Sequence, residues 1–174
     1  MSHDRCNLFR YMRSSHSPNS QPISGTTDRL ELGRLGEEYA RCYLEQQGYT
    51  IVAGNFTLPV GRNLRGAIIN AELDLIAYDG PILCFIEVKT RASDWFAPPQ
   101  VNIDLRKRRQ IARASRAYRR MFGLLDAQYR FDVVTVVLPA EGTTDRFQVE
   151  LLRNFWTETA LRKSWRREDK WYYD

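Results

Sequence analysis

The sequence is poor in histidine and cysteine, which excludes several kinds of catalytic site. Both histidines, His3 and His16, lie in a polar N-terminal segment. A folded core without histidine cannot build a Ser-His-Asp triad, a Cys-His pair or a histidine-ligated metal site. The three cysteines, Cys6, Cys42 and Cys84, are far apart and odd in number, which fits neither a disulfide framework nor a zinc site. We therefore expect reduced cysteines, as in a cytosolic protein.

Long apolar runs are also missing. No apolar stretch reaches the roughly 18 residues of a membrane span, and the N-terminus lacks the apolar segment of a signal peptide. We expect a cytoplasmic protein without a membrane partner. The net charge is +5 and the pI about 9.3, with most of the positive charge on arginine. Arginine favours a phosphate-bearing partner, although a solvated basic surface would have the same composition.

The 174 residues fit one domain with modest tails. We predict a flexible N-terminal tail over 1–26, a domain over 27–156, and a charged C-terminal tail over 157–174 that carries Trp165 and Trp171. Periodicity and turn residues predict, in order, a helix over 28–47, strands over 49–56, 72–78 and 82–90, a helix over 105–122, and strands over 129–138 and 147–152. Residues 57–70 are predicted to be a loop or a β-excursion. This order predicts a mixed sheet flanked by helices.

Residues 71–91, AELDLIAYDGPILCFIEVKTR, place charges inside apolar strands. The dipeptide Asp79-Gly80 is a strong turn signal, and a two-residue loop there would pair Tyr78 with Pro81. Because side chains alternate along a strand, four charged residues would then share one face: Glu72, Asp74, Glu87 and Lys89. Carboxylates crowded on a buried sheet repel each other unless positive charge lies among them. We therefore expect a divalent cation there, together with Lys89.

The two predicted helices also carry candidate residues. Glu37 and Glu38 lie beside the apolar stripe of the first helix, where two solvated surface glutamates are the alternative interpretation. In the second helix, Lys107 lies on the apolar side, where a lysine must either reach solvent or meet a carboxylate or phosphate. The opposite ridge of that helix is basic and is a candidate contact for a nucleic-acid backbone; its residues are Arg109, Arg113, Arg116 and Arg120.

These residue types indicate a reaction. The carboxylates of Asp74 and Glu87, with the backbone carbonyl of Val88, are oxygen ligands suited to Mg²⁺ or Mn²⁺. Such a metal lowers the pKa of a bound water and offsets charge on a phosphodiester. Lys89 could orient that water or stabilise the charge that develops at phosphorus. The site predicts metal-dependent phosphodiester hydrolysis.

Taken together, the motifs resemble the PD-(D/E)xK nuclease superfamily, and within it the bacterial YraN family, which is related to archaeal Holliday-junction resolvases. The residues that carry the resemblance are Gly33-x-x-Gly36-Glu37-x-x-Ala40, Gly48-Tyr49, Asn55, Glu72 to Ile76, Phe85 to Arg91, Lys107 and Arg130 to Val134. The resemblance implies a restriction-endonuclease-like three-layer α/β/α fold with a central mixed β-sheet.

The same resemblance implies roles for individual residues. Asp74 and Glu87 match the metal ligands, and Lys89 matches the catalytic lysine. Glu37 matches a helix glutamate that reaches the metal water or a second metal. Supporting roles are implied for Glu72 and Lys107, and a structural role for Asp132. The chain departs from the family pattern at Ala71, where a glycine is usual, and in an enlarged loop before the motif.

The leading hypothesis is a Mg²⁺- or Mn²⁺-dependent DNA endonuclease that selects branched or single-stranded DNA. One alternative is a catalytically silent nucleic-acid-binding module, and another is a scaffold whose acidic cluster is neutralised by Lys89, Lys107 and nearby arginines. By analogy with junction-cutting enzymes, a homodimer is expected. The candidate nucleic-acid contacts are Arg62, Arg65, Arg91, Arg109, Arg113, Arg116 and Arg120.

Overall fold

A computed structural model of the chain describes residues 27–92, 103–138 and 148–161. The predicted N-terminal tail and most of the predicted C-terminal tail lie outside these residues. The elements, in order, are α2 (Thr27–Gln46), β1 (Thr50–Arg62), β2 (Ile68–Asp79), β3 (Ile82–Ala92), α3 (Leu105–Met121), β4 (Tyr129–Leu138) and β5 (Gln148–Trp156). No helix among the described residues is long and apolar enough to cross a membrane.

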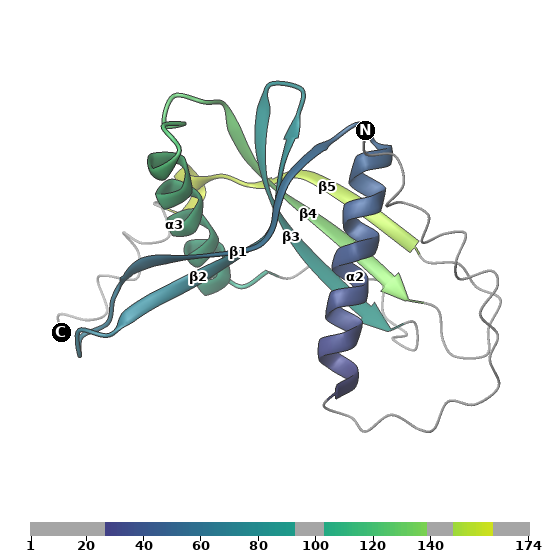
Figure 1. Cartoon of the computed structure of the whole chain (residues 1–174), viewed down its shortest axis with the longest axis horizontal. Coiled ribbons are helices and arrows are strands. Elements are labelled where there is room, and N and C mark those ends of the chain that lie inside the picture. The colour runs from purple at the N-terminus through teal and green to yellow at the C-terminus, as the bar shows by residue number, and fades with distance from the viewer. Residues whose placement is uncertain (1–26, 93–102, 139–147, 162–174) are drawn as a thin grey trace.

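The strands form one five-stranded sheet in the order β1-β2-β3-β4-β5 (Figure 1). Strands β3 and β4 are parallel, and all other neighbours are antiparallel. The predicted order of elements and the predicted mixed sheet are therefore confirmed. The last strand extends beyond the predicted 147–152 because Trp156 pairs with Phe131 and stacks on it, with ring centroids 5.0 Å apart.

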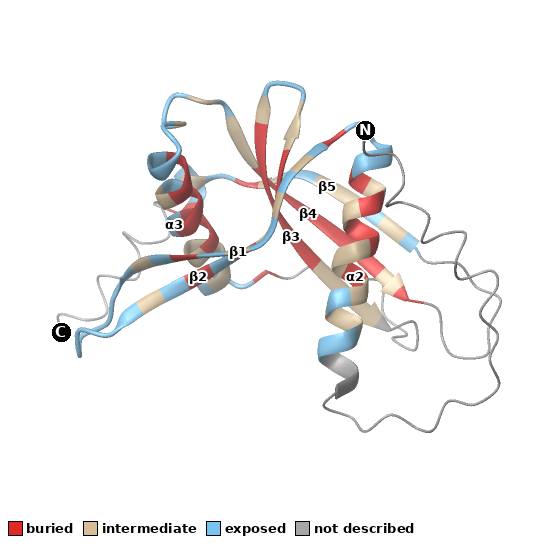
Figure 2. Cartoon of the chain, viewed as in Figure 1, coloured by how far each residue is buried: buried red, intermediate tan, exposed pale blue. Residues whose placement is uncertain are grey.

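The two helices cover opposite faces of the sheet. Leu83 and Phe85 of β3 belong to the half of the core that contains the buried side of α3. The alternate residues of β3, Cys84 and Ile86, belong to the half that contains α2. Side chains on a strand alternate between faces, so one strand feeds both halves. Figure 2 shows the buried residues concentrated on the central strands and on the helix surfaces turned toward them.

The turn between β2 and β3 differs from the prediction. The loop residues are Gly80 and Pro81, because Asp79 pairs with Ile82 and Tyr78 pairs with Leu83. Gly80 has a φ of 57°, a backbone conformation that glycine adopts without steric cost. The predicted pairing of Tyr78 with Pro81 is therefore wrong by two residues. A shift of two residues leaves each side chain on its original face, so Asp74 and Glu87 still face the same side.

Residues 57–70 form a β-excursion rather than an irregular loop. Strands β1 and β2 continue their antiparallel pairing from Leu58 with Ala71 to Arg62 with Ile68. We call this extension, residues 57–71, the arm; Figure 1 shows it projecting from the sheet past α3. Leu58 and Ala71 are buried in the α3 half of the core. The arm is therefore anchored at its base by packing against α3.

Local hydrogen bonds fix the helix ends that position the site. Helix α2 closes where the N–H of Tyr49 donates to the carbonyl of Leu44 at 2.9 Å, with Gly48 at a φ of 86°. This is a glycine C-terminal motif, in which the glycine adopts the left-handed conformation. Helix α3 begins after Asp104, whose side chain accepts a hydrogen bond from the N–H of Lys107 at 2.7 Å. The start of α3, and with it the position of Lys107, is set by this cap.

Replacing Gly36 with alanine should destabilise the protein. A Cβ atom at Gly36 would overlap the side chain of Thr90 on β3, so Gly36→Ala should lower the free energy of unfolding by about 1–3 kcal/mol through overpacking. Urea denaturation measures this change. The matched control is Gly33→Ala, where no atom lies within 4 Å of the added carbon and a gain of about 0.5–1 kcal/mol is expected. Adding Thr90→Ala to Gly36→Ala should recover part of the loss, because it removes two of the three overlapping atoms and leaves the Cβ of residue 90 at 2.7 Å. Equal destabilisation by Gly36→Ala and Gly33→Ala would contradict the close contact.

Candidate active site

The candidate site lies where β2 separates from β3. The last paired residues are Leu75 and Ile86, and Asp74 is the next residue of β2. Its Oδ2 accepts a hydrogen bond from the backbone N–H of Val88 at 2.9 Å. The carboxylate thus replaces the strand partner that this N–H would otherwise lack, and buried N–H groups rarely stay unpaired. Backbone geometry therefore fixes one carboxylate of the site.

The alternation of β2 breaks at the same point. Ile76 and Leu73, three residues apart, both pack in the α3 half of the core, whereas Leu75 packs in the α2 half. The two faces of β2 therefore exchange between the halves of the core at Asp74. Glu72 lies beyond this turn and is exposed, so it does not join the buried face with Asp74 and Glu87 as the alternation predicted.

Glu87 is the buried centre of the charged cluster. Its side chain is 2% exposed, and its Oε1 accepts a hydrogen bond from Lys89 Nζ at 2.7 Å. Its Oε2 lies 3.1 Å from Lys107 Nζ, and the same nitrogen lies 3.7 Å from Asp74 Oδ1. Lys107 therefore bridges both carboxylates from α3. Of the alternatives predicted for a lysine on the apolar side of this helix, contact with carboxylates is the one that the structure shows.

The cluster shifts the pKa values of its members. Burial raises the pKa of Asp74 to about 7, with a further increase from the charge of Glu87; Lys107 and the Val88 N–H act in the opposite direction. Burial alone would lower the pKa of Lys107, but the charges of Asp74 and Glu87 outweigh it and raise that pKa. Two carboxylates this close are both ionised only with help from positive charge, which Lys89 and Lys107 supply.

The donor set fits Mg²⁺ or Mn²⁺. Within the described ranges, no three His, Cys, Asp or Glu side chains gather closely enough to form a metal site by themselves. Mg²⁺ does not require such a group, because it usually keeps several waters and binds one or two carboxylates together with substrate phosphates. The paired carboxylates of Asp74 and Glu87, with the carbonyl of Val88, match this coordination preference of Mg²⁺.

Glu37 contacts β1 rather than the carboxylate pair. It lies on α2 next to Gly36 and is half-buried, and its Oε2 accepts a hydrogen bond from Asn55 Nδ2 at 2.9 Å. Asn55 has a φ of 52°, a region that asparagine tolerates better than most residues. In the part of the chain that the structure describes, no hydrogen bond or ion pair links Glu37 to Asp74 or Glu87. Asn55 is one of the residues that carry the family resemblance, but the spacing of residues along the chain does not predict its contact with Glu37.

Asp132 has the structural role that the resemblance implied. It is fully buried and accepts hydrogen bonds from Arg130 Nε at 2.9 Å and from the N–H of Asn154 at 2.8 Å. Arg130 also donates to Asp79 at 2.6 Å and to the hydroxyl of Tyr49 at 2.7 Å. This network joins the β2–β3 turn to β4 and β5, so it fixes the sheet on which the site is built.

The predicted nucleic-acid-binding arginines fall into two groups. Arg113, Arg116 and Arg120 line one groove between α3 and the arm. The others are dispersed: Arg62 donates to the carbonyl of Gly66 in the arm, and Arg65 is exposed in the same turn. Arg91 and Arg109 are half-buried and interact with other residues.

Comparison with known proteins identifies the family. A family model described as "Uncharacterised protein family UPF0102" matches residues 36–136, a range that contains Asp74, Glu87, Lys89 and Lys107. The chain belongs to the UPF0102 family. UPF0102 is the YraN family that the motifs resemble, so that prediction is confirmed.

Individual relatives agree. A UPF0102 protein of Solibacter usitatus (strain Ellin6076) is 43% identical over 108 residues, which cover 62% of this chain and 76% of the relative. A UPF0102 protein of Desulfosudis oleivorans is 39% identical over 126 residues, covering 72% of this chain and 89% of the relative. One solved structure, described as "Crystal structure of SSO0001", matches at 16% identity with a TM-score of 0.30, over 76% of this chain and 55% of that one.

Asp74→Asn should reduce the pH dependence of stability when metal is removed with EDTA. The pKa of Asp74 is about 7 in the folded protein, against about 3.9 in an unfolded chain. Its contribution to stability is therefore full below pH about 4 and is lost as the pH rises through about 7, by up to about 1.4 kcal/mol per pH unit. Asparagine does not titrate, so the variant should lose less stability over this range.

Urea denaturation of the UPF0102 protein at several pH values between about 4 and 8 measures this difference. The matched control is Asp126→Asn, which alters an exposed aspartate after α3 and should keep the wild-type dependence. The assignment of Asp74 is wrong if Asp74→Asn loses as much stability across that range as the wild type.

Proposed function

We propose that this UPF0102 protein is a Mg²⁺- or Mn²⁺-dependent DNA endonuclease with a restriction-endonuclease-like fold and a preference for branched DNA. The observation that carries the proposal is the charged cluster at the point where β2 separates from β3, which we call the fork. Two carboxylates that would repel each other are held there within reach of two lysines. A mixed sheet with a helix on each face supports the proposed fold.

Asp74 and Glu87 would hold the metal, and the carbonyl of Val88 is a further oxygen donor. When bound, the metal would lower the pKa of a water and offset charge on the phosphodiester. The chain's own groups position the rest. Glu87 orients Lys89 through their 2.7 Å hydrogen bond, so the ammonium can hold a water or stabilise charge at the phosphorus.

Lys107 would support the site from α3. Its ammonium lies against both carboxylates and offsets their repulsion, which keeps the pair assembled before a substrate arrives. Glu37 is proposed to reach the metal water or a second metal, and its fixed hydrogen bond with Asn55 gives it a defined starting position. Glu72 is proposed as a supporting, substrate-facing carboxylate, which agrees with its exposure.

The competing proposal is a catalytically silent nucleic-acid-binding module. Its basic surface would bind DNA through arginines such as Arg113, Arg116 and Arg120. A module that only binds DNA gains nothing from gathering carboxylates, since these repel phosphates. The buried pair therefore favours the enzyme. A homodimer and a cytoplasmic location stay predictions.

The cleavage reaction gives the test. Purified protein is incubated with branched, single-stranded and duplex DNA in Mg²⁺, Mn²⁺ or EDTA. We expect cutting with either metal and none in EDTA. Lys89→Met should lower the cleavage rate by about 10²–10³-fold, the usual loss when one group that stabilises transition-state charge is removed. Asp74→Asn should abolish the metal dependence along with most of the rate.

Asp126→Asn and Arg34→Gln serve as controls, because both alter exposed charges away from the cluster and should cut like the wild type. If Lys89→Met and Asp74→Asn cut as fast as the wild type, the activity belongs to a contaminant or to another site. If every protein binds DNA and none cuts it, the silent binding module is the correct function.

A further inference from the structure

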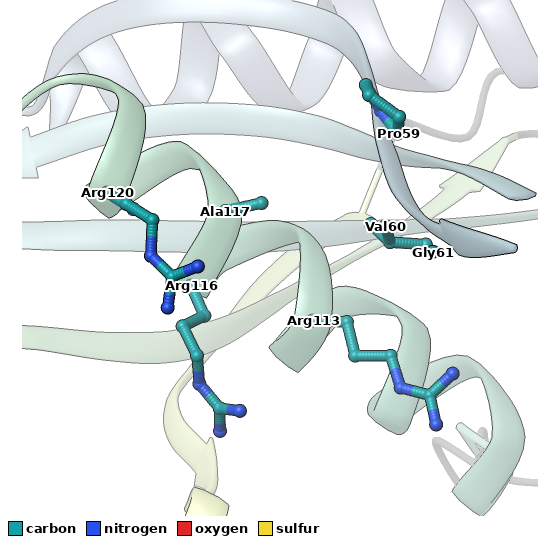
Figure 3. A pocket seen from close by; sticks show the side chains of 7 residues that line it. All are labelled: Pro59, Val60, Gly61, Arg113, Arg116, Ala117 and Arg120. Carbon is teal, nitrogen blue, oxygen red and sulfur yellow. The ribbon is translucent and has the colours of Figure 1, made fainter. Parts of the chain in front are cut away.

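A groove lies between the arm and α3, apart from the carboxylate pair (Figure 3). Its volume is about 430 Å³. One wall is part of β1 and the other is part of α3. The lining residues are Pro59, Val60 and Gly61 from β1, and Arg113, Arg116, Ala117 and Arg120 from α3.

The helical wall is strongly basic. Its three arginines lie on successive turns of α3, and none of the described residues that line the groove is acidic. Arg120 is exposed. Arg116 forms an ion pair with Glu158 at 2.6 Å, yet its side chain stays 48% exposed. A row of guanidinium groups beside an open groove attracts a polyanion, and guanidinium binds phosphate in a bidentate manner.

The opposite wall is apolar. Pro59 has no N–H and Val60 is half-buried. The pairing of β1 with β2 is irregular between Pro59 and Gly61. A Cβ at Gly61 would have no atom within 4 Å, so this side of the groove is open. An occupant would therefore meet charge on one side and an apolar surface on the other, as a nucleotide strand does with its phosphates and its sugars and bases.

The two unlike walls favour one strand over a duplex, because a single strand exposes its bases as well as its phosphates. A volume of about 430 Å³ is in the range of pockets for single small molecules, about 300–1,000 Å³. Along α3 the three arginines are separated by about 4.5 and 6 Å at the helical rise, so they form one row beside the groove.

The groove is too far from the carboxylates to contact the phosphate that is cut. Lys107 contacts Asp74 and Glu87, and Arg113 to Arg120 follow on the same helix about 9 to 20 Å farther along its axis. We infer that the groove binds the sugar–phosphate backbone of a single-stranded segment of the nucleic acid that the carboxylate site acts on. The link to cutting rests on the proposed endonuclease function, but the binding does not.

Fluorescence anisotropy tests the inference. The probe is a labelled oligothymidylate of about 16 nucleotides, and the full chain carries Asp74→Asn so that no cutting interferes. Arg120→Gln should weaken binding about 3- to 10-fold and lower the slope of log affinity against log salt by about 0.7, the value for one phosphate contact on a single strand. Arg120→Glu should weaken it more. Arg34→Gln, the same change on an exposed arginine of α2, should have no effect.

A blunt duplex that contains the same oligothymidylate is the second probe, and its affinity should change less than 2-fold in Arg120→Gln. The inference is overturned if Arg120→Glu binds the single strand as the parent does. It is also overturned if the variant weakens both probes equally, because the groove would then bind a duplex surface. Strand binding that depends on Arg120 in a protein that cuts nothing would refute the endonuclease and keep the inference. Metal-dependent cutting by the wild type, with unchanged single-strand affinity in Arg120→Glu, would support the endonuclease and refute the inference about the groove.

Discussion

The separation of β2 from β3 is the constraint on which the rest of the site depends. Pairing stops after Leu75 and Ile86, and Asp74 then accepts the hydrogen bond of Val88 that a paired strand would have accepted. Beyond this point β2 keeps its pairing with β1, and the two strands leave β3 together as the arm. Because the arm packs against α3, one interruption in the ladder creates both the carboxylate cluster and the groove beside the helix.

Charge at the fork is balanced within a small space. Glu87 is almost fully buried, and its partners come from β3 and α3. Isolated buried charges are unfavourable by several kcal/mol, and the two lysines, Lys89 and Lys107, offset the two carboxylates. Burial nevertheless raises the pKa of Asp74 to about 7, because it removes water from the carboxylate. A divalent cation bound there would favour the ionised form, which connects the energetics of the fold to the proposed chemistry.

Local sequence signals predict the elements well. Both ends of β4 are as predicted, because 129–138 is an uninterrupted β run, and α3 starts at the predicted residue, Leu105. Period-2 alternation brought Asp74 and Glu87 together although the register was wrong. The same alternation failed at Glu72, because it assumes a continuous strand and cannot anticipate a break. The contact of Glu37 with Asn55 and the groove at Arg120 depend on tertiary packing, which spacing does not encode.

The most direct measurement for this account is a titration of Mn²⁺ into the DNA-free protein, followed by electron paramagnetic resonance. The account predicts that the wild type binds Mn²⁺ at the carboxylate pair and that Glu87→Gln loses this binding. Asp79→Asn, which alters an aspartate in the Arg130 network, should keep it. Equal Mn²⁺ binding by the wild type and Glu87→Gln, or no binding by the wild type, would contradict a metal site at the fork.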